Sequence, residues 1–194
     1  MGLAGLALAG ASLAGPMPRP KSDGEVCGTA ALVGRVLPRE TGEGGCGIAV
    51  PVRLAVAAGV ALEPPATVAC ETARTFAGWL EAAAKPEFAA RGARLEAVTV
   101  ADAYSCRGRN RKAGAKLSEH AFGRAIDISG FRLGDGTEVT VREDWGTKDW
   151  GPVLRRAYDA ACGRFGTVLG PEANALHADH LHLDVAARRS PYCE

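Results

Sequence analysis

The spacing of apolar residues changes along this chain, and each spacing predicts a different kind of element. From residue 27 to 66, short apolar stretches are interrupted by Gly and Pro, a pattern typical of irregular strands and turns. Apolar residues recur at helical spacing over 68–84, which predicts a helix that ends before Pro86. Residues 95–104 contain Val, Thr and Tyr and predict a strand, whereas the basic segment 107–117 predicts a loop.

The second half of the chain predicts more strands and one further helix. Residues 124–133 and 137–143 predict two strands joined by an Asp-Gly hairpin turn. Residues 150–165 place apolar side chains on one side of a helix, and 180–185 alternate as a half-buried strand does. We therefore expect one disulfide-stabilised α+β domain, in which a small antiparallel sheet is flanked by helices.

The first 26 residues predict a leader and a linker. Residues 3–14 form an apolar run without charge, which is too short to span a bilayer and resembles the apolar core of a signal peptide. We assign 1–15 to this signal-like segment, the Pro-rich residues 16–26 to a linker, and 27–194 to the folded domain. The alternative is a disordered Ala/Gly tail, because no Lys or Arg precedes the apolar run.

Composition excludes some functions and supports a folded domain. The 23 Lys and Arg residues nearly balance the 22 Asp and Glu residues, which argues against nucleic acid as a partner. The balance also argues against a basic membrane-binding surface, so we expect membrane contact only through an uncleaved leader. A hydrophobic fraction of 47% is sufficient for a core of ordinary size.

The cysteines predict an oxidising compartment. No two of the six form a Cys-x-x-Cys pair, so a zinc knuckle or a thioredoxin-type site is disfavoured. An even number of scattered cysteines behind a signal-like start favours disulfides, and hence export to the periplasm or cell envelope. The alternative is a cytosolic protein with buried reduced thiols. If the cysteines pair in sequential order, the bridges are Cys27–Cys46, Cys70–Cys106 and Cys162–Cys193.

All four histidines lie in two short segments. The first segment, Ser-Glu-His-Ala-Phe-Gly-Arg-Ala-Ile-Asp, covers 118–127 and contains His120. The second, His-Ala-Asp-His-Leu-His-Leu-Asp, covers 177–184 and contains the other three, His177, His180 and His182. Histidines with scattered structural roles would not cluster in this way, so the two segments are candidates for one site.

The geometry of strands suggests a metal site. On a strand His180, His182 and Asp184 would share one face. Asp127 lies between two isoleucines, so its carboxylate would point away from them and would need a partner such as a divalent cation. Two histidines and one aspartate with an open fourth position are typical of a catalytic zinc site. The alternatives are a structural or adventitious metal, or histidines that only bind each other.

The two segments also resemble known families. The pattern SxHxxGxAxD at 118–127, followed by His180-x-His182, resembles zinc peptidases of bacterial cell walls, namely D-alanyl-D-alanine carboxypeptidases and murein endopeptidases, which are related to a hedgehog-type fold. From Cys27 to Cys193 the chain is more closely similar to the bacterial extensin-like C-terminal domain family. That closer similarity rests on YSCR at 104–107, SEHAFGRAIDISGF at 118–131, VLGP at 168–171, the histidine-rich segment and the terminal Tyr-Cys.

The resemblance implies a set of metal ligands. His120, Asp127 and His182 would bind Zn²⁺. His180 would lie beside the metal as a base or oxyanion stabiliser. Asp179 takes the place where the carboxypeptidases have a glutamate, whereas the endopeptidases have histidines there, which His177 and His180 resemble in spacing. The identity of the general base therefore stays open, with His180 and Asp179 as the candidates.

The resemblance also implies a substrate. Arg107 resembles an arginine that binds a substrate carboxylate, although it could equally be a solvated arginine of a basic loop. The implied activity is zinc-dependent hydrolysis of amide bonds in peptidoglycan stem peptides, with peptidoglycan or its peptides as partner. The alternative is a non-catalytic cell-wall-binding or scaffold module that retains the metal site.

Overall fold

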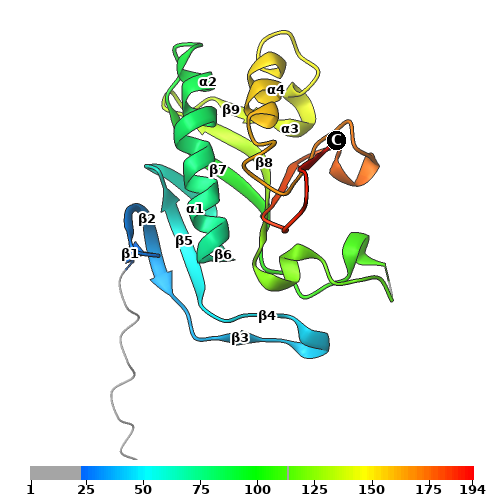
Figure 1. The fold of residues 1–194 in the computed structure, drawn as a ribbon. Coiled ribbons are helices and arrows are strands. Elements are labelled where there is room, and N and C mark those ends of the chain that lie inside the picture. Colours follow the sequence, from blue (N-terminus) through cyan, green and yellow to red (C-terminus); the bar gives the residue numbers. More distant parts are fainter. Residues whose placement is uncertain (1–22, 113) are drawn as a thin grey trace, which may run out of the picture.

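A ten-stranded sheet forms the centre of the computed structural model, which describes residues 23–112 and 114–194 (Figure 1). In the order in which they lie side by side, its strands are β1 (Gly24–Val26), β2 (Thr29–Val36), β5 (Pro51–Ala57), β6 (Val60–Ala69), β7 (Leu95–Asp102), β8 (Ala125–Leu133), β11 (Leu181–Asp184), β10 (Thr167–Leu169) and β12 (Tyr192–Cys193), with β9 (Glu138–Thr140) also paired to β8. A separate hairpin contains β3 (Glu40–Thr41) and β4 (Gly47–Ile48).

The expectation of a small antiparallel sheet is wrong in size and in strand direction. Most neighbours are antiparallel, but β6 pairs with β7, and β10 with β12, in parallel. A parallel pair needs a long crossover, and the helical segment between β6 and β7 provides one. The Gly and Pro residues of 27–66 mark the turns and bulges of continuous strands, so this region contributes β2, β5 and most of β6 to the sheet.

The helices cover one side of the sheet. They are α1 (Cys70–Trp79), the π-helical segment η2 (Leu80–Ala84), α2 (Lys85–Ala89), α3 (Val141–Asp144) and α4 (Gly151–Asp159). In the described residues, 3₁₀ turns lie at η1 (Glu43–Gly45), η3 (Arg109–Arg111), η4 (Glu119–Phe122) and η5 (Ala175–His177). Figure 1 shows α1 and α2 end to end along the sheet, with α4 beside them. The indole of Trp79 donates a hydrogen bond of 2.8 Å to the carbonyl of Ala157, which ties the first helix to the last.

Several predicted boundaries shift. The first helix begins at Cys70, because β6 extends to Ala69, and it continues past Pro86. Pro86 lies in the first turn of α2, after the π-helical segment has changed the hydrogen-bond register, and a first turn needs no amide donor there. The last helix ends at Asp159, well before residue 165. The strands at β7 and β11 and the β8–β9 hairpin are confirmed, except that β9 ends at Thr140 and residues 141–143, predicted as strand, begin α3.

Alternation along the strands separates the core from the site. Ile126, Ile128, Leu181 and Leu183 are fully buried in the hydrophobic core beneath the helices. Because successive side chains on a strand point to opposite faces, Asp127 must point to the face away from that core. The polar residues that β8 and β11 bring together therefore lie on the side of the sheet that the helices leave open.

Three disulfides join the chain, and two of the sequential pairings are wrong. The bonds are Cys27–Cys70, Cys46–Cys106 and Cys162–Cys193, so Cys27–Cys46 and Cys70–Cys106 do not form. The physical reason is the sheet: the β1–β2 turn lies at the start of α1, and the β3–β4 hairpin reaches the loop after β7. The third pairing is confirmed and holds β12 to the end of the last helical region. Disulfides of this number are typical of an oxidising compartment.

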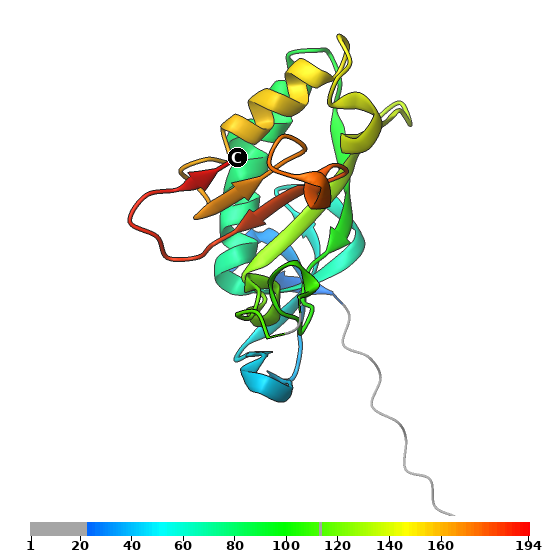
Figure 2. The same ribbon diagram turned by 90° about the vertical axis from the view of Figure 1, so that its right-hand side faces the viewer.

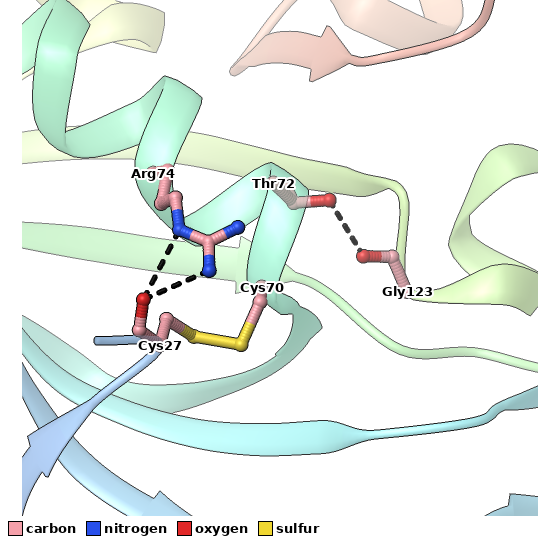
Figure 3. The surroundings of a disulfide bond; sticks show 5 residues. All are labelled: Cys27, Cys70, Thr72, Arg74 and Gly123. Atoms are coloured by element: carbon pink, nitrogen blue, oxygen red, sulfur yellow. Dashed lines mark hydrogen bonds between the residues drawn. A yellow bond between two sulfur atoms is a disulfide. The ribbon is translucent and has the colours of Figure 1, made fainter. Parts of the chain in front are cut away.

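The start of α1 anchors a second segment of the chain (Figure 3). Cys70 is bonded to Cys27, and the guanidinium of Arg74 donates to the carbonyl of Cys27 at 2.8 and 3.1 Å. The buried hydroxyl of Thr72 donates to the carbonyl of Gly123 at 2.8 Å. Gly123 ends the η4 turn, so this first turn of α1 fixes the turn that carries His120.

Gly123 has a backbone and a surrounding that only glycine tolerates. Its φ is +63°, in the left-handed region. A Cβ at this position would lie 2.3 Å from Cδ1 of Ile48 and 3.0 Å from the backbone nitrogen of Ala69. The glycine of the SxHxxGxAxD pattern therefore lets the η4 turn pack closely against β4 and the start of α1.

The expected leader at 1–15 and most of the expected linker lie outside the described residues. Residues 24–26, which we assigned to the linker, instead form β1 and pair with β2, so the folded domain begins earlier than Cys27. Within the described ranges, no helix is long and apolar enough to cross a membrane.

We predict that Gly123→Ala lowers the free energy of unfolding by about 2–4 kcal/mol, because a left-handed alanine is strained and its methyl group meets Ile48. Gly92→Ala is the matched control, since Gly92 has a φ of +73° but open space around it, and it should cost only about 1–2 kcal/mol. Urea denaturation followed by circular dichroism measures both. Equal losses for the two variants would contradict the close packing of the η4 turn.

Candidate metal centre

Three buried side chains from two distant segments converge at the open face of the sheet. Asp127 on β8 and His182 on β11 are directly opposite each other in the antiparallel register, and His120 comes from η4. Oδ1 of Asp127 lies 2.8 Å from Nδ1 of His182 and 3.2 Å from Nε2 of His120. The two imidazole nitrogens are 3.2 Å apart. The three ligand atoms predicted from the sequence therefore form one compact triangle.

The triangle fits a tetrahedral zinc ion in size and in chemistry. Zinc binds nitrogen and oxygen ligands at about 2.0–2.1 Å, so two ligands of a tetrahedral site are about 3.3 Å apart. The observed separations of 2.8 to 3.2 Å are close to this value. Two imidazoles and one carboxylate are also a ligand set that zinc accepts. This group could therefore hold a metal ion.

In both His120 and His182, the ring nitrogen that faces away from the triangle has a hydrogen-bond partner. Nδ1 of His120 lies 2.5 Å from the carbonyl oxygen of Ala103, which can only accept, so this nitrogen donates. Nε2 of His182 lies 3.1 Å from a carboxylate oxygen of Asp184 and donates to it in the same way. In the neutral rings, the nitrogens that face the centre then carry lone pairs, as metal ligands must.

Asp184 is a residue of the site to which the sequence assigned no role. It lies two residues after His182 on β11, is buried, and is also held by the amide of Ala186 at 3.0 Å. The signal was present in the His-x-His-x-Asp alternation, which places all three side chains on one face of a strand. Its carboxylate orients the ring of His182 and would raise the basicity of that ring toward a metal ion.

Charges at the centre are strongly coupled. Burial alone would raise the pKa of Asp127, but hydrogen bonds from His120 and His182 outweigh burial and hold this pKa far below its usual range. Burial lowers the pKa of His182, yet the hydrogen bonds to Asp127 and Asp184 dominate and raise it to about 9. In the metal-free protein a proton on His182 therefore occupies the place that a cation would take.

His180 lies beside the triad in a chain of hydrogen bonds. Its Nε2 is 3.7 Å from Oδ2 of Asp127, and its Nδ1 is 2.8 Å from Oδ1 of Asp179. The other oxygen of Asp179 accepts a bond of 2.6 Å from the guanidinium of Arg142 on α3. The hydrogen bond with His180 is the main cause that lowers the pKa of Asp179. The two carboxylate oxygens of Asp179 thus bind His180 and Arg142, and the ring of His180 lies between Asp179 and the triad.

The fourth histidine, His177, also belongs to this cluster. Its ring lies 5.2 Å from that of His180 and 6.0 Å from that of His182, and its Nδ1 is 3.0 Å from Oδ1 of Asn174. Burial, reinforced by the neighbouring imidazoles, lowers the pKa of His177 to about 4. This ring is therefore neutral at physiological pH.

A cleft of about 450 Å³ opens over the triad. His120, Asp127 and His182 form part of its lining, and so do His180 and Arg107. The guanidinium of Arg107 is largely buried and forms an ion pair of 3.0 Å with Asp102, the last residue of β7. Its Nε has no hydrogen-bond partner among the described residues. The structure thus brings the predicted residues to one cleft, with the exception of Asp179, which does not line the cleft and lies behind His180.

We predict that zinc affinity rises about ten-fold per pH unit up to about pH 9 and then levels off, because the proton on His182 must leave before the metal binds. Competition with a chromophoric chelator from about pH 7 to about pH 10 measures this slope. An affinity that does not change over this range would show that His182 is not the protonated ligand.

Metal-free protein should show the opposite trend in stability. A raised pKa stabilises the folded state while His182 is protonated, so the contribution is complete below about pH 6.5 and is lost as the pH rises towards 9. The free energy of unfolding should fall by about 3 kcal/mol over this window in chelated protein and much less with zinc bound. Urea titrations at several pH values measure it, and a flat profile would contradict the assignment.

We further predict that Asp184→Asn weakens zinc binding about 10- to 100-fold, because the ring of His182 loses its carboxylate partner. Asp149→Asn, at an exposed loop position, is the matched control and should leave the dissociation constant unchanged. Calorimetry of zinc binding measures both. Equal affinity of the two variants would rule out the orienting role of Asp184.

Comparison with known proteins gives a family for the chain. Searches of curated proteins and of solved structures found no match. The family model described as Extensin-like protein C-terminus matches residues 25–194, which include all but the first residue of the sheet and every residue of the candidate metal centre. This match confirms the family that the motifs indicated. The chain belongs to the Extensin-like protein C-terminus family.

Proposed function

We propose that this protein is a zinc-dependent hydrolase that cleaves amide bonds in peptidoglycan stem peptides. The observation that carries the proposal is the triad of His120, Asp127 and His182 at the lining of an open cleft, with His180 beside it. A structural zinc site is closed by a fourth protein ligand, whereas a catalytic site keeps one position open. Among the described residues the group that fits an ion has three members, and all three line the cleft.

Zinc, when bound, supplies Lewis acidity that polarises a carbonyl group and lowers the pKa of water. The chain's own contribution begins with the rigidity of its ligands. The carbonyl of Ala103 and the carboxylate of Asp184 fix the two imidazole rings, and the register of β8 and β11 fixes Asp127. Ligands held in this way need no rearrangement during the reaction.

His180 is the general base in this proposal. Its Nδ1 donates to Asp179, so Nε2 carries the lone pair and points towards the centre. In the reaction Nε2 takes a proton from the attacking water as the water oxygen bonds to the carbonyl carbon. The same proton then passes to the leaving amine as the carbon–nitrogen bond breaks. Asp179 is a poorer base, because its oxygens are engaged by His180 and Arg142 and its pKa is lowered.

Arg107 orients the substrate in this proposal. It lines the cleft, and a guanidinium suits a substrate carboxylate because it can form two parallel hydrogen bonds. Its ion pair with Asp102 holds the side chain at the end of β7, where Asp102 is the strand neighbour of Asp127 on β8. The alternative of a freely solvated loop arginine fits less well with a side chain that is only 18% exposed.

The substrate and compartment are supported by sequence resemblance and by the disulfides. SxHxxGxAxD and His-x-His resemble zinc peptidases that act on bacterial cell walls, and three disulfides favour an exported protein of the periplasm or cell envelope. Asp179 stands where the carboxypeptidases have a glutamate, which favours the second candidate, a cell-wall-binding or scaffold module that keeps the metal site without catalysis.

The test is digestion of purified muropeptides by zinc-loaded protein, followed by mass spectrometry. We predict cleavage that chelator abolishes and zinc restores. His180→Gln should retain zinc and lower kcat about 100- to 10,000-fold, since it removes the base. Arg189→Gln, at an exposed position outside the cleft, is the control and should leave kcat unchanged.

Two outcomes would contradict catalysis. Muropeptides that stay intact with zinc-loaded protein would refute the hydrolase. Intact muropeptides together with zinc-dependent binding to peptidoglycan would instead support the non-catalytic module. Cleavage that survives His180→Gln unchanged would leave the hydrolase standing and refute His180 as its base.

A further inference from the structure

One arginine of the cleft differs from the others in its partners. Arg107 and Arg111 pair with Asp102, and Arg109 pairs with Glu119. Arg188 also lines the cleft, yet across the described ranges no carboxylate lies within ion-pair distance of it. It is the cleft arginine whose positive charge the protein leaves uncompensated.

Neutral groups hold this arginine in place. Nε of Arg188 donates to the hydroxyl of Thr167 at 2.9 Å, and the guanidinium carbon lies 5.7 Å from the centre of the Tyr192 ring. Thr167 is buried on β10, directly opposite Asp184, and Tyr192 is its partner on β12. Cys193 follows Tyr192 and is cross-linked to Cys162. The guanidinium is thus positioned without being neutralised, so its remaining N–H groups are available to an anion.

The two anchored arginines lie on opposite sides of the metal centre. Arg107 is tied to Asp102 on β7, and Arg188 to Thr167 on β10. Between these strands lie β8 and β11, which carry Asp127 and His182. Figure 2 shows the two loops apart, with the loop after β7 in green near the base of the view and the loop before β12 in red at its left edge.

The spacing of strands gives the separation of the anchors. From β7 to β10 there are three strand spacings of about 4.8 Å, or about 14 Å in all. An extended peptide advances about 3.3 Å per residue, so about four residues cover this distance. A peptide that crosses the strands would therefore have one end near each arginine and its middle over the triad.

Apolar side chains accompany the unpaired charge. The described residues have four large apolar side chains that are exposed, and two of them, Leu176 and Tyr192, line this cleft. An exposed aromatic ring beside a fixed guanidinium offers both a stacking surface and a charge to one ligand group.

We propose that Arg188, Thr167 and Tyr192 form a second substrate subsite, which binds a carboxylate on the side of the metal centre opposite Arg107. The ligand class is a peptide with two carboxylates about four residues apart, with the bond to be cleaved between them. This subsite deepens the proposed function and rests on it, because it presumes that a peptide occupies the cleft.

The test measures binding rather than turnover. The probes are a synthetic peptide whose C-terminal carboxylate lies four residues from a glutamate side chain, and two analogues in which one or the other carboxyl group is amidated. Dissociation constants are measured by calorimetry on zinc-loaded protein that carries His180→Gln, so that hydrolysis is slowed. Arg188→Gln, Arg188→Lys and Arg107→Gln are added separately, and Arg189→Gln, an exposed neighbour outside the cleft, is the matched control.

We expect Arg188→Gln to weaken binding of the doubly charged peptide about ten-fold or more, since it removes charge-assisted hydrogen bonds. Arg188→Lys should lose less, because the charge stays while the planar fork is lost. For one of the two amidated peptides the effect of Arg188→Gln should disappear, and for the other the effect of Arg107→Gln should disappear. Arg189→Gln should bind within about two-fold of the parent protein.

The outcomes separate the subsite from the hydrolase. If Arg188→Gln binds the doubly charged peptide as tightly as the parent, or if the parent binds none of the three peptides, the subsite is refuted. If binding depends on Arg188 while wild-type protein cleaves no muropeptide, the hydrolase fails and the subsite stands. If muropeptides are cleaved and the dissociation constant of the doubly charged peptide does not depend on Arg188, the subsite is refuted and the hydrolase stands.

Discussion

The candidate site depends on the register between β8 and β11. These antiparallel strands place Asp127 directly opposite His182, at the distance of neighbouring strands, and the isoleucines and leucines on either side of them are buried in the core. If either strand shifted by one residue, its own polar side chain would turn into that core and its apolar residues would turn out of it. The same hydrophobic burial that stabilises the sheet therefore fixes two of the three ligands. The cost of a buried carboxylate is offset by the imidazoles that face it.

The third ligand needs a different mechanism, because η4 is a short turn with little hydrophobic burial of its own. Its position comes from contacts at both ends. Thr72 holds the carbonyl of Gly123, and the ring of His120 bonds the backbone of Ala103. The glycine allows the approach to Ile48 that these contacts require. The β8–β11 pair thus positions two of the three side chains, and the η4 turn, held at both ends, positions the third.

Strand alternation and the clustering of histidines predicted a polar site on one face of the sheet, and the resemblance to zinc peptidases singled out His120, Asp127 and His182 as its ligands. Both patterns can be read within short segments, because the alternation of side chains along a strand does not depend on distant parts of the chain. The same reasoning gave the β8–β9 hairpin and the strands at β7 and β11.

The sequence was a poor guide wherever distant segments meet. The disulfide partners of Cys27 and Cys46 depend on which turns the sheet brings together, and no spacing along the chain reports that. The size of the sheet was missed because glycines and prolines between 27 and 66 interrupt the apolar pattern without ending the strands. The contact of Asp179 with Arg142 likewise needed the approach of α3 to the segment just before β11.

Two of the disulfides make the two sides of the cleft more sensitive to reduction than the triad between them. Cys106 directly precedes Arg107, and Cys193 directly follows Tyr192. On each side of the cleft, a disulfide therefore cross-links the residue next to a lining side chain. The metal ligands are held by hydrogen bonds and apolar packing within the sheet and its adjoining turn. Under reducing conditions the triad would keep its donor atoms in place, while the segments at Arg107 and Tyr192 would lose their cross-links. Full assembly of the cleft would therefore require a compartment in which thiols are oxidised.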